Sequence, residues 1–183
     1  MRSEIRVAGF GGQGVITFGY VLAMAASIHD GNYSLMTQSY GPEARGGACR
    51  SDVIISDVSI DYPKLSKVGC FVAMSIDAYN QFYKTVRPGA TVILEEDLVK
   101  VPACHLLKDV AYYRIPAMRE AEALGNRLAA NMVMLGAAQT VTRAASKESL
   151  EEAIKQRFPR FSEVNIKALH RGIALGRNAM EEE

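Results

Sequence analysis

Cysteine and histidine are scarce in this 183-residue chain, and neither type is clustered. No two cysteines form a C-x-x-C pair, and no two histidines have the H-x-x-x-H spacing that places both on one helix face. The residues concerned are Cys49, Cys70, Cys104, His29, His105 and His170. Their spacing argues against a disulfide framework and against an iron-sulfur cluster or structural zinc within this chain. We therefore expect no metal to be bound by this chain alone.

An excess of one sign of charge is also missing. The chain has 21 Lys and Arg against 20 Asp and Glu, a formal net charge of +1. Nucleic acids and anionic membranes both favour a concentrated basic surface, so we expect neither as a partner. No apolar run is long enough to span a bilayer. The charged residues Arg2, Glu4 and Arg6 precede a strand-like run rather than a signal-peptide core, and we expect a cytoplasmic protein.

Familiar catalytic motifs are absent from the sequence. It contains no G-x-S-x-G elbow, no P-loop, no H-x-E with C-x-x-C, and no local pairing of His with Cys. The acids Asp52, Asp57 and Asp61 are irregularly spaced, and we expect them to serve turns. We therefore assign no catalytic residue to this chain.

What the sequence does contain is a group of glycines directly after the apolar run that begins at Ile5. Gly9, Gly11 and Gly14 stand in the G-x-G-x-x-G pattern, and an apolar-periodic segment follows. The pattern predicts a strand, a tight turn and a helix whose unpaired N-H groups point at whatever lies above the turn.

This turn has two interpretations from the residues alone. A dinucleotide site also needs an acidic residue at the end of the second strand, but that strand runs into Gln38, Ser39 and Tyr40. The alternative is structural, with glycines that only let the first helix lie closely on the sheet. Gln13 favours more than packing, because its side-chain amide is suited to orienting a neighbouring backbone or ligand.

A second glycine-rich segment, residues 39–48, follows the second predicted strand. It is either a mobile surface loop or an interface, where aromatic and arginine anchors framed by glycines bury well. Because the first and second strands are expected to form a parallel βαβ pair, both glycine-rich segments should lie side by side on the same edge of the sheet.

Composition and periodicity together predict one α/β domain over residues 1–183. Apolar residues make up 49% of the chain, enough for a sizeable core. We expect a three-layer α/β/α arrangement with a mostly parallel, Rossmann-like sheet and a helical C-terminal third. The predicted strands lie near residues 5–9, 33–38, 49–56, 69–74, 90–94 and 111–115, with extended residues at 103–107. A returning strand near residues 58–63 would make the sheet mixed.

The two glycine-rich motifs together, Gly9 to Val15 and Ser39 to Gly47, closely resemble the gamma subunit of 2-oxoacid:ferredoxin or flavodoxin oxidoreductases. The resemblance covers the whole length, and the Tyr-Gly-Pro-Glu form of the second motif looks most like the 2-oxoglutarate branch. A pyruvate or other oxoacid branch, a stand-alone Rossmann-like nucleotide-binding enzyme and a bare interaction module are the alternatives.

The resemblance implies a subunit of an enzyme that converts a 2-oxoacid to its acyl-coenzyme A. In that family, thiamine diphosphate and the iron-sulfur clusters are held mainly by other subunits: thiamine-diphosphate-binding alpha and beta chains and a ferredoxin-like delta chain. We expect this chain to be structural and inactive in isolation. The expected contacts to a coenzyme A phosphate or a subunit are Gly11, Gly12, Gln13 and Gly14. The expected partner-facing loop contains Tyr40, Gly41, Glu43, Arg45, Gly46 and Gly47.

Overall fold

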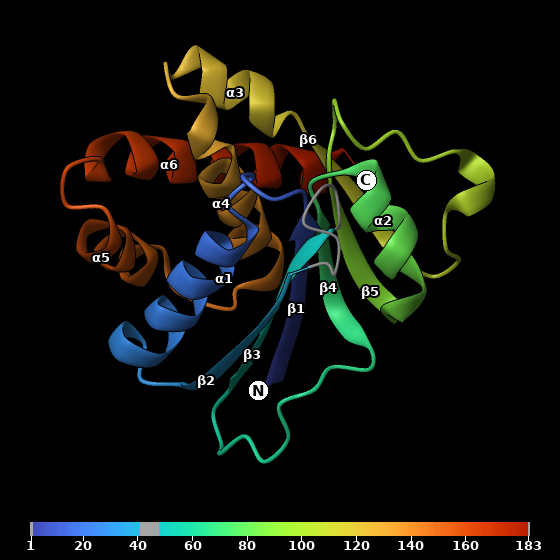
Figure 1. Ribbon diagram of the computed structural model, residues 1–183, viewed down its shortest axis with the longest axis horizontal. Helices are drawn as coiled ribbons and strands as arrows, with labels where there is room; N and C mark the ends of the chain where they lie inside the picture. The colour runs from blue at the N-terminus through green and yellow to red at the C-terminus, as the bar shows by residue number, and fades with distance from the viewer. Residues whose placement is uncertain (1, 41–47, 183) are drawn as a thin grey trace.

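A six-stranded sheet forms the centre of the protein in the computed structural model, which describes residues 2–40 and 48–182. Its strands are ordered β2-β3-β1-β4-β5-β6 (Figure 1). Their bounds are β1 Arg2–Gly9, β2 Tyr33–Ser39, β3 Cys49–Ser56, β4 Val68–Ala73, β5 Val86–Glu95 and β6 Ala111–Ile115. The predicted strands at 5–9, 33–38, 49–56, 69–74, 90–94 and 111–115 are therefore all present.

The direction of β3 makes the sheet mixed. β1 pairs in parallel with β4, and the ladder continues in parallel through β5 to β6, whereas β3 pairs antiparallel with both β1 and β2. β1 and β2 thus point the same way, as predicted, but they do not pair. The expected βαβ neighbours are separated by β3, because the segment after β2 returns directly beside it as a hairpin partner.

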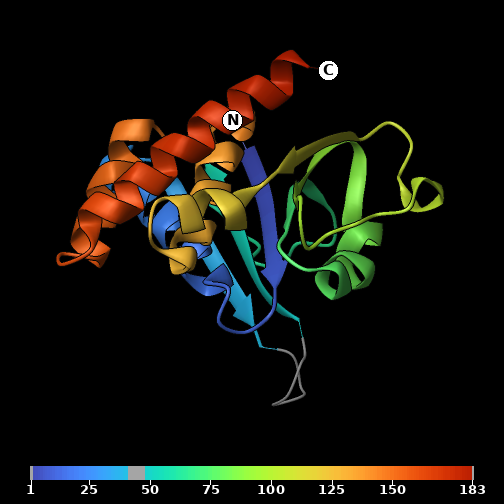
Figure 2. The ribbon, with the colours of Figure 1, turned by 90° about the horizontal axis from the view of Figure 1, so that it is seen from above.

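Helices cover both faces of this sheet, so the three-layer prediction is confirmed (Figure 2). One face carries α1 Val15–Met24, α3 Ala117–Ala123, α4 Ala130–Thr142, α5 Lys147–Arg157 and α6 Ser162–Glu181, and the other carries α2 Ile76–Phe82. The short helical turns are η1 Ala25–His29 (a π-helix), η2 Tyr83–Thr85, η3 Ala103–His105 and η4 Arg127–Ala129. The C-terminal third is helical, as expected.

Small residues let α4 and α6 pack closely on the first face. A Cβ atom on Gly172 would clash with the carbonyl of Val133, and one on Gly136 would clash with the carbonyl of Leu169. The two helices therefore meet backbone to backbone, which confirms the close approach that small residues favour at helix crossings. Their apolar faces join α1 and the sheet in one large core.

A buried ion pair crosslinks β1 and β3 beneath the second face. The Arg6 guanidinium donates to both carboxylate oxygens of Asp52 at 2.7 Å, and also to Oγ1 of Thr85 at 2.8 Å. It lies 5.4 Å from the centre of the Phe82 ring. The expectation that Asp52 serves a turn is wrong, because this residue lies within β3 and neutralises a fully buried arginine.

Two local predictions were wrong. Residues 58–63 form no strand, because β3 ends at Ser56 and the chain leaves the sheet there. The segment expected to be extended at 103–107 begins with the turn η3. Neither stretch has the strand partner on the sheet that would satisfy an extended backbone.

Candidate functional site

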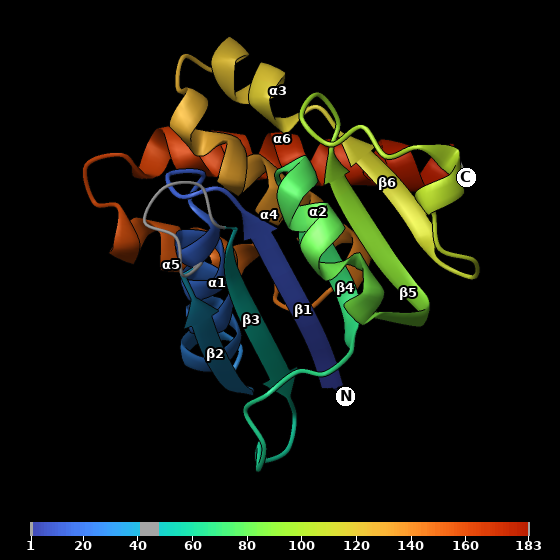
Figure 3. The ribbon, with the colours of Figure 1, turned by 45° about the vertical axis from the view of Figure 1, so that its right-hand side comes forward.

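The glycine turn after β1 lies at the edge of the sheet where β1, β2, β4 and β5 end and β3 begins (Figure 3). Residues 10–14 leave the sheet there and lead into α1. In open α/β sheets, ligands bind at this edge, beyond the carboxyl ends of the strands. The expected position of the first motif is therefore confirmed.

Gln13 fixes the shape of this turn through its side-chain amide. Its Oε1 accepts a hydrogen bond from the backbone N-H of Phe10 at 2.7 Å, and its Nε2 donates to the carbonyl of Met74 at 2.8 Å. The amide thus joins the turn after β1 to the residue that follows β4. Gly9 must lack a Cβ, since one would collide with the Gln13 Oε1. Gln13 therefore orients backbone, one of the two roles expected for it.

Gly12 and Gly14 both have positive φ angles, 91° and 74°. Gly14 is the N-cap of α1, and no side chain caps this helix. The N-H groups of its first turn are therefore left without an intrahelical acceptor, next to the positive end of the helix dipole. A Cβ on Gly12 would meet nothing within 4 Å, so the space above this position is open.

Asn131 of α4 holds the start of α1 from the opposite side. Its Nδ2 donates to the carbonyl of Gly14 at 3.2 Å, and a Cβ on Gly14 would overlap this amide. Within the start of α6, the Nδ2 of Asn165 donates to the carbonyl of Phe161 at 2.9 Å. Only 5% of Asn131 and 7% of Asn165 are exposed. Neither Oδ1 has a hydrogen-bond partner among the described residues, so each is free to accept one from a ligand.

A groove of about 660 Å³ opens beside the turn, between the start of α1, the residues before α4 and the start of α6. Both asparagines line it. Phe161, which is 62% exposed, forms an aromatic wall. The lining residues are Gly12, Gly14, Thr17, Gly125, Asn126, Leu128, Asn131, Phe158, Phe161, Val164 and Asn165.

A smaller hollow of about 250 Å³ lies on the other side of Gly12 and Leu128. Its lining is largely apolar. It consists of Gly12, Gln13, Met74, Leu98, Met118, Arg127, Leu128 and Ala130. Gly12 and Leu128 are shared by both spaces, so the glycine turn forms part of their common rim.

The second motif is only partly within the described residues. Tyr40 follows β2 and is 64% exposed. Gly41, Glu43, Arg45, Gly46 and Gly47 lie outside the described residues, so their expected roles stay predictions. The strand ends that flank the motif reach the same edge as the glycine turn, but β3 lies between β1 and β2. The strands that precede the two motifs are therefore not neighbours in the sheet.

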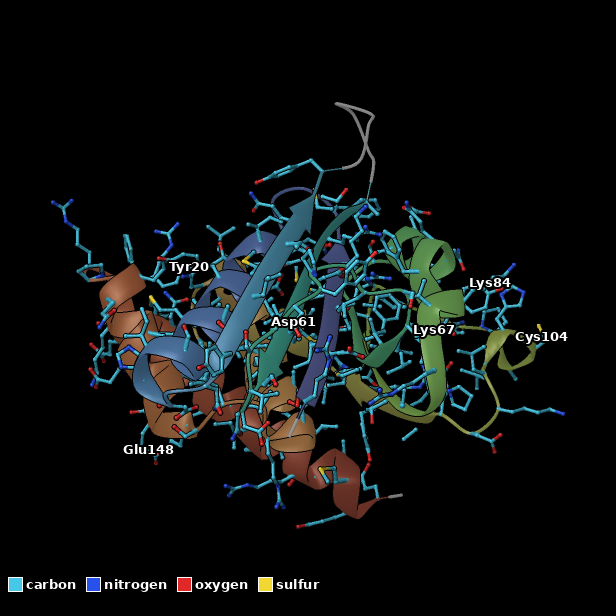
Figure 4. All side chains as sticks on the ribbon, turned by 90° about the horizontal axis from the view of Figure 1, so that it is seen from below. Tyr20, Asp61, Lys67, Lys84, Cys104 and Glu148 are labelled. Atoms are coloured by element: carbon cyan, nitrogen blue, oxygen red, sulfur yellow. The ribbon has the colours of Figure 1, made fainter. Side chains whose placement is uncertain are left out.

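The three cysteines lie on different elements, β3, β4 and η3, and are not disulfide-bonded. Cys70 is buried in β4, and burial raises its thiol pKa to about 12, which fits the expected buried hydrophobe. Cys104 lies on the outlying turn η3 (Figure 4). Within residues 2–40 and 48–182, no group of three or more His, Cys, Asp or Glu side chains could hold a metal ion. No helix in that part of the chain is long and apolar enough to cross a membrane.

Sequence reasoning missed Asn131, Asn165 and the buried acid Glu95. The two asparagines occur inside helical patterns, where a polar residue looks like an exposed face. Asn131 is separated from Gly14 by 117 residues, so only the fold brings them together. The glycine spacing at Gly14 requires a close neighbour, but it does not say which residue that is.

Comparisons with known proteins agree with this architecture. Residues 4–175 match the family described as pyruvate ferredoxin/flavodoxin oxidoreductase. The chain is 47% identical over 177 residues to 2-oxoglutarate synthase subunit KorC of Methanothermobacter marburgensis, covering 94% of this chain and 95% of that protein. It is 30% identical to ketoisovalerate oxidoreductase subunit VorA of the same organism, covering 98% of this chain and 38% of VorA.

Two solved structures are similar over nearly the whole chain. The gamma subunit of a keto/oxoacid ferredoxin oxidoreductase from Geobacter sulfurreducens is 36% identical with a TM-score of 0.87, and 98% of each chain is covered. The 2-oxoglutarate:ferredoxin oxidoreductase from Magnetococcus marinus, with 2-oxoglutarate, coenzyme A and succinyl-CoA bound, is 25% identical with a TM-score of 0.88. That match covers 97% of this chain and 31% of the Magnetococcus chain.

Proposed function

Because this chain belongs to the pyruvate ferredoxin/flavodoxin oxidoreductase family, we propose that it is the gamma subunit of an oxidoreductase that converts 2-oxoglutarate to succinyl-coenzyme A. Membership confirms the resemblance expected from the two glycine-rich motifs. The choice of 2-oxoglutarate rests on the identity to 2-oxoglutarate synthase subunits, which exceeds that to the ketoisovalerate and pyruvate relatives.

In this proposal, the subunit contributes a surface that contacts the ligand and partner chains, the sheet edge with the glycine turn, and it contributes no catalytic group. In the same proposal, thiamine diphosphate and the iron-sulfur clusters belong to partner chains. There the thiazolium ring of thiamine diphosphate would supply the decarboxylation chemistry, and the clusters would carry electrons to ferredoxin or flavodoxin. The separated cysteines of this chain fit that division, because a cluster requires several thiolates together. The alpha, beta and delta chains expected from the resemblance are the proposed partners.

The observation that carries the proposal is the uncapped start of α1, which opens onto the groove. Free amides and a helix dipole suit the phosphates of coenzyme A. Next to them, the Phe161 ring offers a stacking surface, and the amide oxygens of Asn131 and Asn165 can accept hydrogen bonds from an N-H donor such as the adenine amino group. The proposed phosphate and base contacts would thus share one groove of suitable size for a small ligand.

Relatives in which this domain is only part of a longer chain support a permanent partner. The match covers 38% of VorA and 31% of the Magnetococcus chain, so in those proteins the domain is covalently joined to further polypeptide. In a separate chain, the same neighbour must be held by surface contacts. The exposed side chains of Phe10, Tyr40, Leu128 and Phe161 around the edge offer the anchors such an interface needs.

The substrate is tested in the complex purified from its native host, assayed with 2-oxoglutarate, pyruvate and branched-chain 2-oxoacids. We expect kcat/KM for 2-oxoglutarate to exceed that for the other acids by at least about tenfold, the usual discrimination of a dedicated pocket. Equal turnover of all three would contradict the assignment to the 2-oxoglutarate branch. The isolated chain should show no oxidoreductase activity with any of them.

The role of the edge is tested with a pair of matched glycine variants. Gly12 and Gly31 both have positive φ and open space at Cβ, but Gly31 lies on the turn before β2, away from the edge. Gly12→Ala and Gly31→Ala should therefore lose similar backbone stability. In the complex, only Gly12→Ala should raise the KM for coenzyme A, by about fivefold or more if a phosphate approaches the turn closely. Equal KM values for the two variants would contradict the binding of coenzyme A at this edge.

A further inference from the structure

Glu95 is a fully buried carboxylate at the last position of β5, on the same edge as the glycine turn. Asp52, which is also buried, is neutralised by Arg6. No cation lies within ion-pair distance of Glu95 in residues 2–40 and 48–182. Burying a carboxylate without a cation is strongly unfavourable unless hydrogen bonds replace the lost water.

Two backbone amides take the place of that water. The Glu95 Oε2 accepts a hydrogen bond from the N-H of Leu98 at 2.7 Å, and its Oε1 accepts one from the N-H of Met118 at 3.1 Å. Leu98 belongs to the turn after β5, whereas Met118 is in the first turn of α3. A single rigid group therefore sets the spacing between these two segments.

Both segments form walls of the smaller hollow beside the glycine turn. The side chains of Leu98 and Met118 line it together with Gly12, Gln13 and Met74. Gln13 ties the turn to the carbonyl of Met74, on the side of the hollow contributed by β4. On the side of the hollow contributed by β5 and α3, Glu95 likewise ties the turn after β5 to the start of α3.

A cap that only stabilised the start of α3 would not require a buried carboxylate such as that of Glu95. Arg119 already holds α3 to the turn after β5 from outside, through ion pairs with Glu96 and Asp97. A polar residue at the surface could cap α3 without burial of a charge. Unlike these exposed ion pairs, the buried Glu95 carboxylate fixes the backbone of Leu98 and Met118 inside the wall of the hollow.

We propose that Glu95 is a positioning residue. It holds Leu98 and Met118 at the separation that lets the apolar arm of coenzyme A, whose phosphates belong to the proposed groove at the start of α1, enter the adjoining hollow beside Gly12. This inference rests on the proposed function of the edge. Glu95 acts through the backbone of the two wall segments.

The test is Glu95→Gln in the assembled complex, with KM and kcat measured separately. Glutamine keeps the side-chain volume, but its NH2 group would face one of the two backbone N-H groups that now donate to the carboxylate. One of the two hydrogen bonds would therefore be lost. The assays are run well below the melting temperature of the variant. We expect the KM for coenzyme A to rise about fivefold while kcat stays within about twofold of the unmodified value. Glu152→Gln, on the exposed face of α5, removes the same charge and should leave both constants unchanged.

A purely structural role gives a different result. It would lower the melting temperature and reduce kcat in proportion to the folded fraction, with an unchanged KM, and this outcome would overturn the inference. If Glu95→Gln does not fold, Leu98→Ala and Met118→Ala alter the walls and leave the carboxylate in place. An unchanged KM in both would equally overturn it.

The Gly12→Ala variant separates this failure from that of the proposed function. A raised KM in Gly12→Ala with an unchanged KM in Glu95→Gln contradicts only the role of Glu95. Unchanged KM values in both contradict coenzyme A at this edge altogether.

Discussion

At the scale of single residues, Gly14 is constrained more tightly than Gly12, although both have positive φ. A side chain at either position is strained by the backbone conformation, at about 1 kcal/mol or more. Only Gly14 also faces a neighbour, the buried amide of Asn131. We expect Gly14→Ala to lower the free energy of unfolding by about 3 kcal/mol and Gly12→Ala by about 1 kcal/mol. Urea unfolding of the isolated chain measures both, and equal losses would show that Asn131 does not restrict the turn.

The buried ion pair makes a second residue-scale prediction. Asp52→Asn leaves the Arg6 guanidinium fully buried without its countercharge, which should cost about 3 kcal/mol of unfolding free energy. Replacing both residues together, as Arg6→Met with Asp52→Leu, should recover most of this loss, because no uncompensated charge remains. Chemical denaturation of the single and double variants checks this. A double variant as unstable as Asp52→Asn would mean that packing and not charge dominates the site.

At the scale of elements, Asp30 links the end of the first helical segment to the start of α5. Its carboxylate accepts hydrogen bonds from the backbone N-H and the Oγ of Ser146, at 2.8 and 2.7 Å, and from the Oγ of Ser149. Burial acts to raise the pKa of Asp30, but the hydrogen bonds from Ser149 and Ser146 outweigh it, so the pKa is lowered.

The depressed pKa of Asp30 gives a pH dependence with a definite sign. An acid with a lowered folded-state pKa stabilises the fold above its unfolded pKa, near 3.8, and loses this contribution as the pH falls through the folded value. Asp30→Ala should therefore cost about 1 kcal/mol at pH 7 and progressively less below about pH 4. Thermal unfolding across this range tests it, with Asp61→Ala as an exposed control. A difference that grows on acidification would contradict the assignment.

The elements themselves were largely predictable from the sequence, whereas their arrangement was only partly so. Continuous apolar runs such as Val68–Ala73 indicate strands covered on both faces, and glycine spacing indicates the turn before α1. The pairing of β3 between β1 and β2 was not predictable, because apolar patterning does not reveal direction. The contacts of Glu95 with Met118 and of Asn131 with Gly14 were missed for a similar reason, because each joins segments that are distant in sequence.

At the scale of the whole molecule, the large core and the proposed functional edge occupy different parts of the structure. The large core joins α1, α4, α5 and α6 to one face of the sheet. The edge after the strands carries the uncapped helix start, two acceptor amides and exposed apolar side chains. In the proposed function, partner subunits and coenzyme A would cover this edge and pair with its free amides.

The most direct test of this account is an add-back titration. The partner subunits are prepared without this chain, and the coenzyme A-dependent oxidation of 2-oxoglutarate is measured as the purified chain is added. We expect negligible activity at the start, and a saturable rise to the rate of the native complex. Full activity of the partners alone, or activity of this chain alone, would contradict the assignment of the chain as a non-catalytic subunit that completes the enzyme.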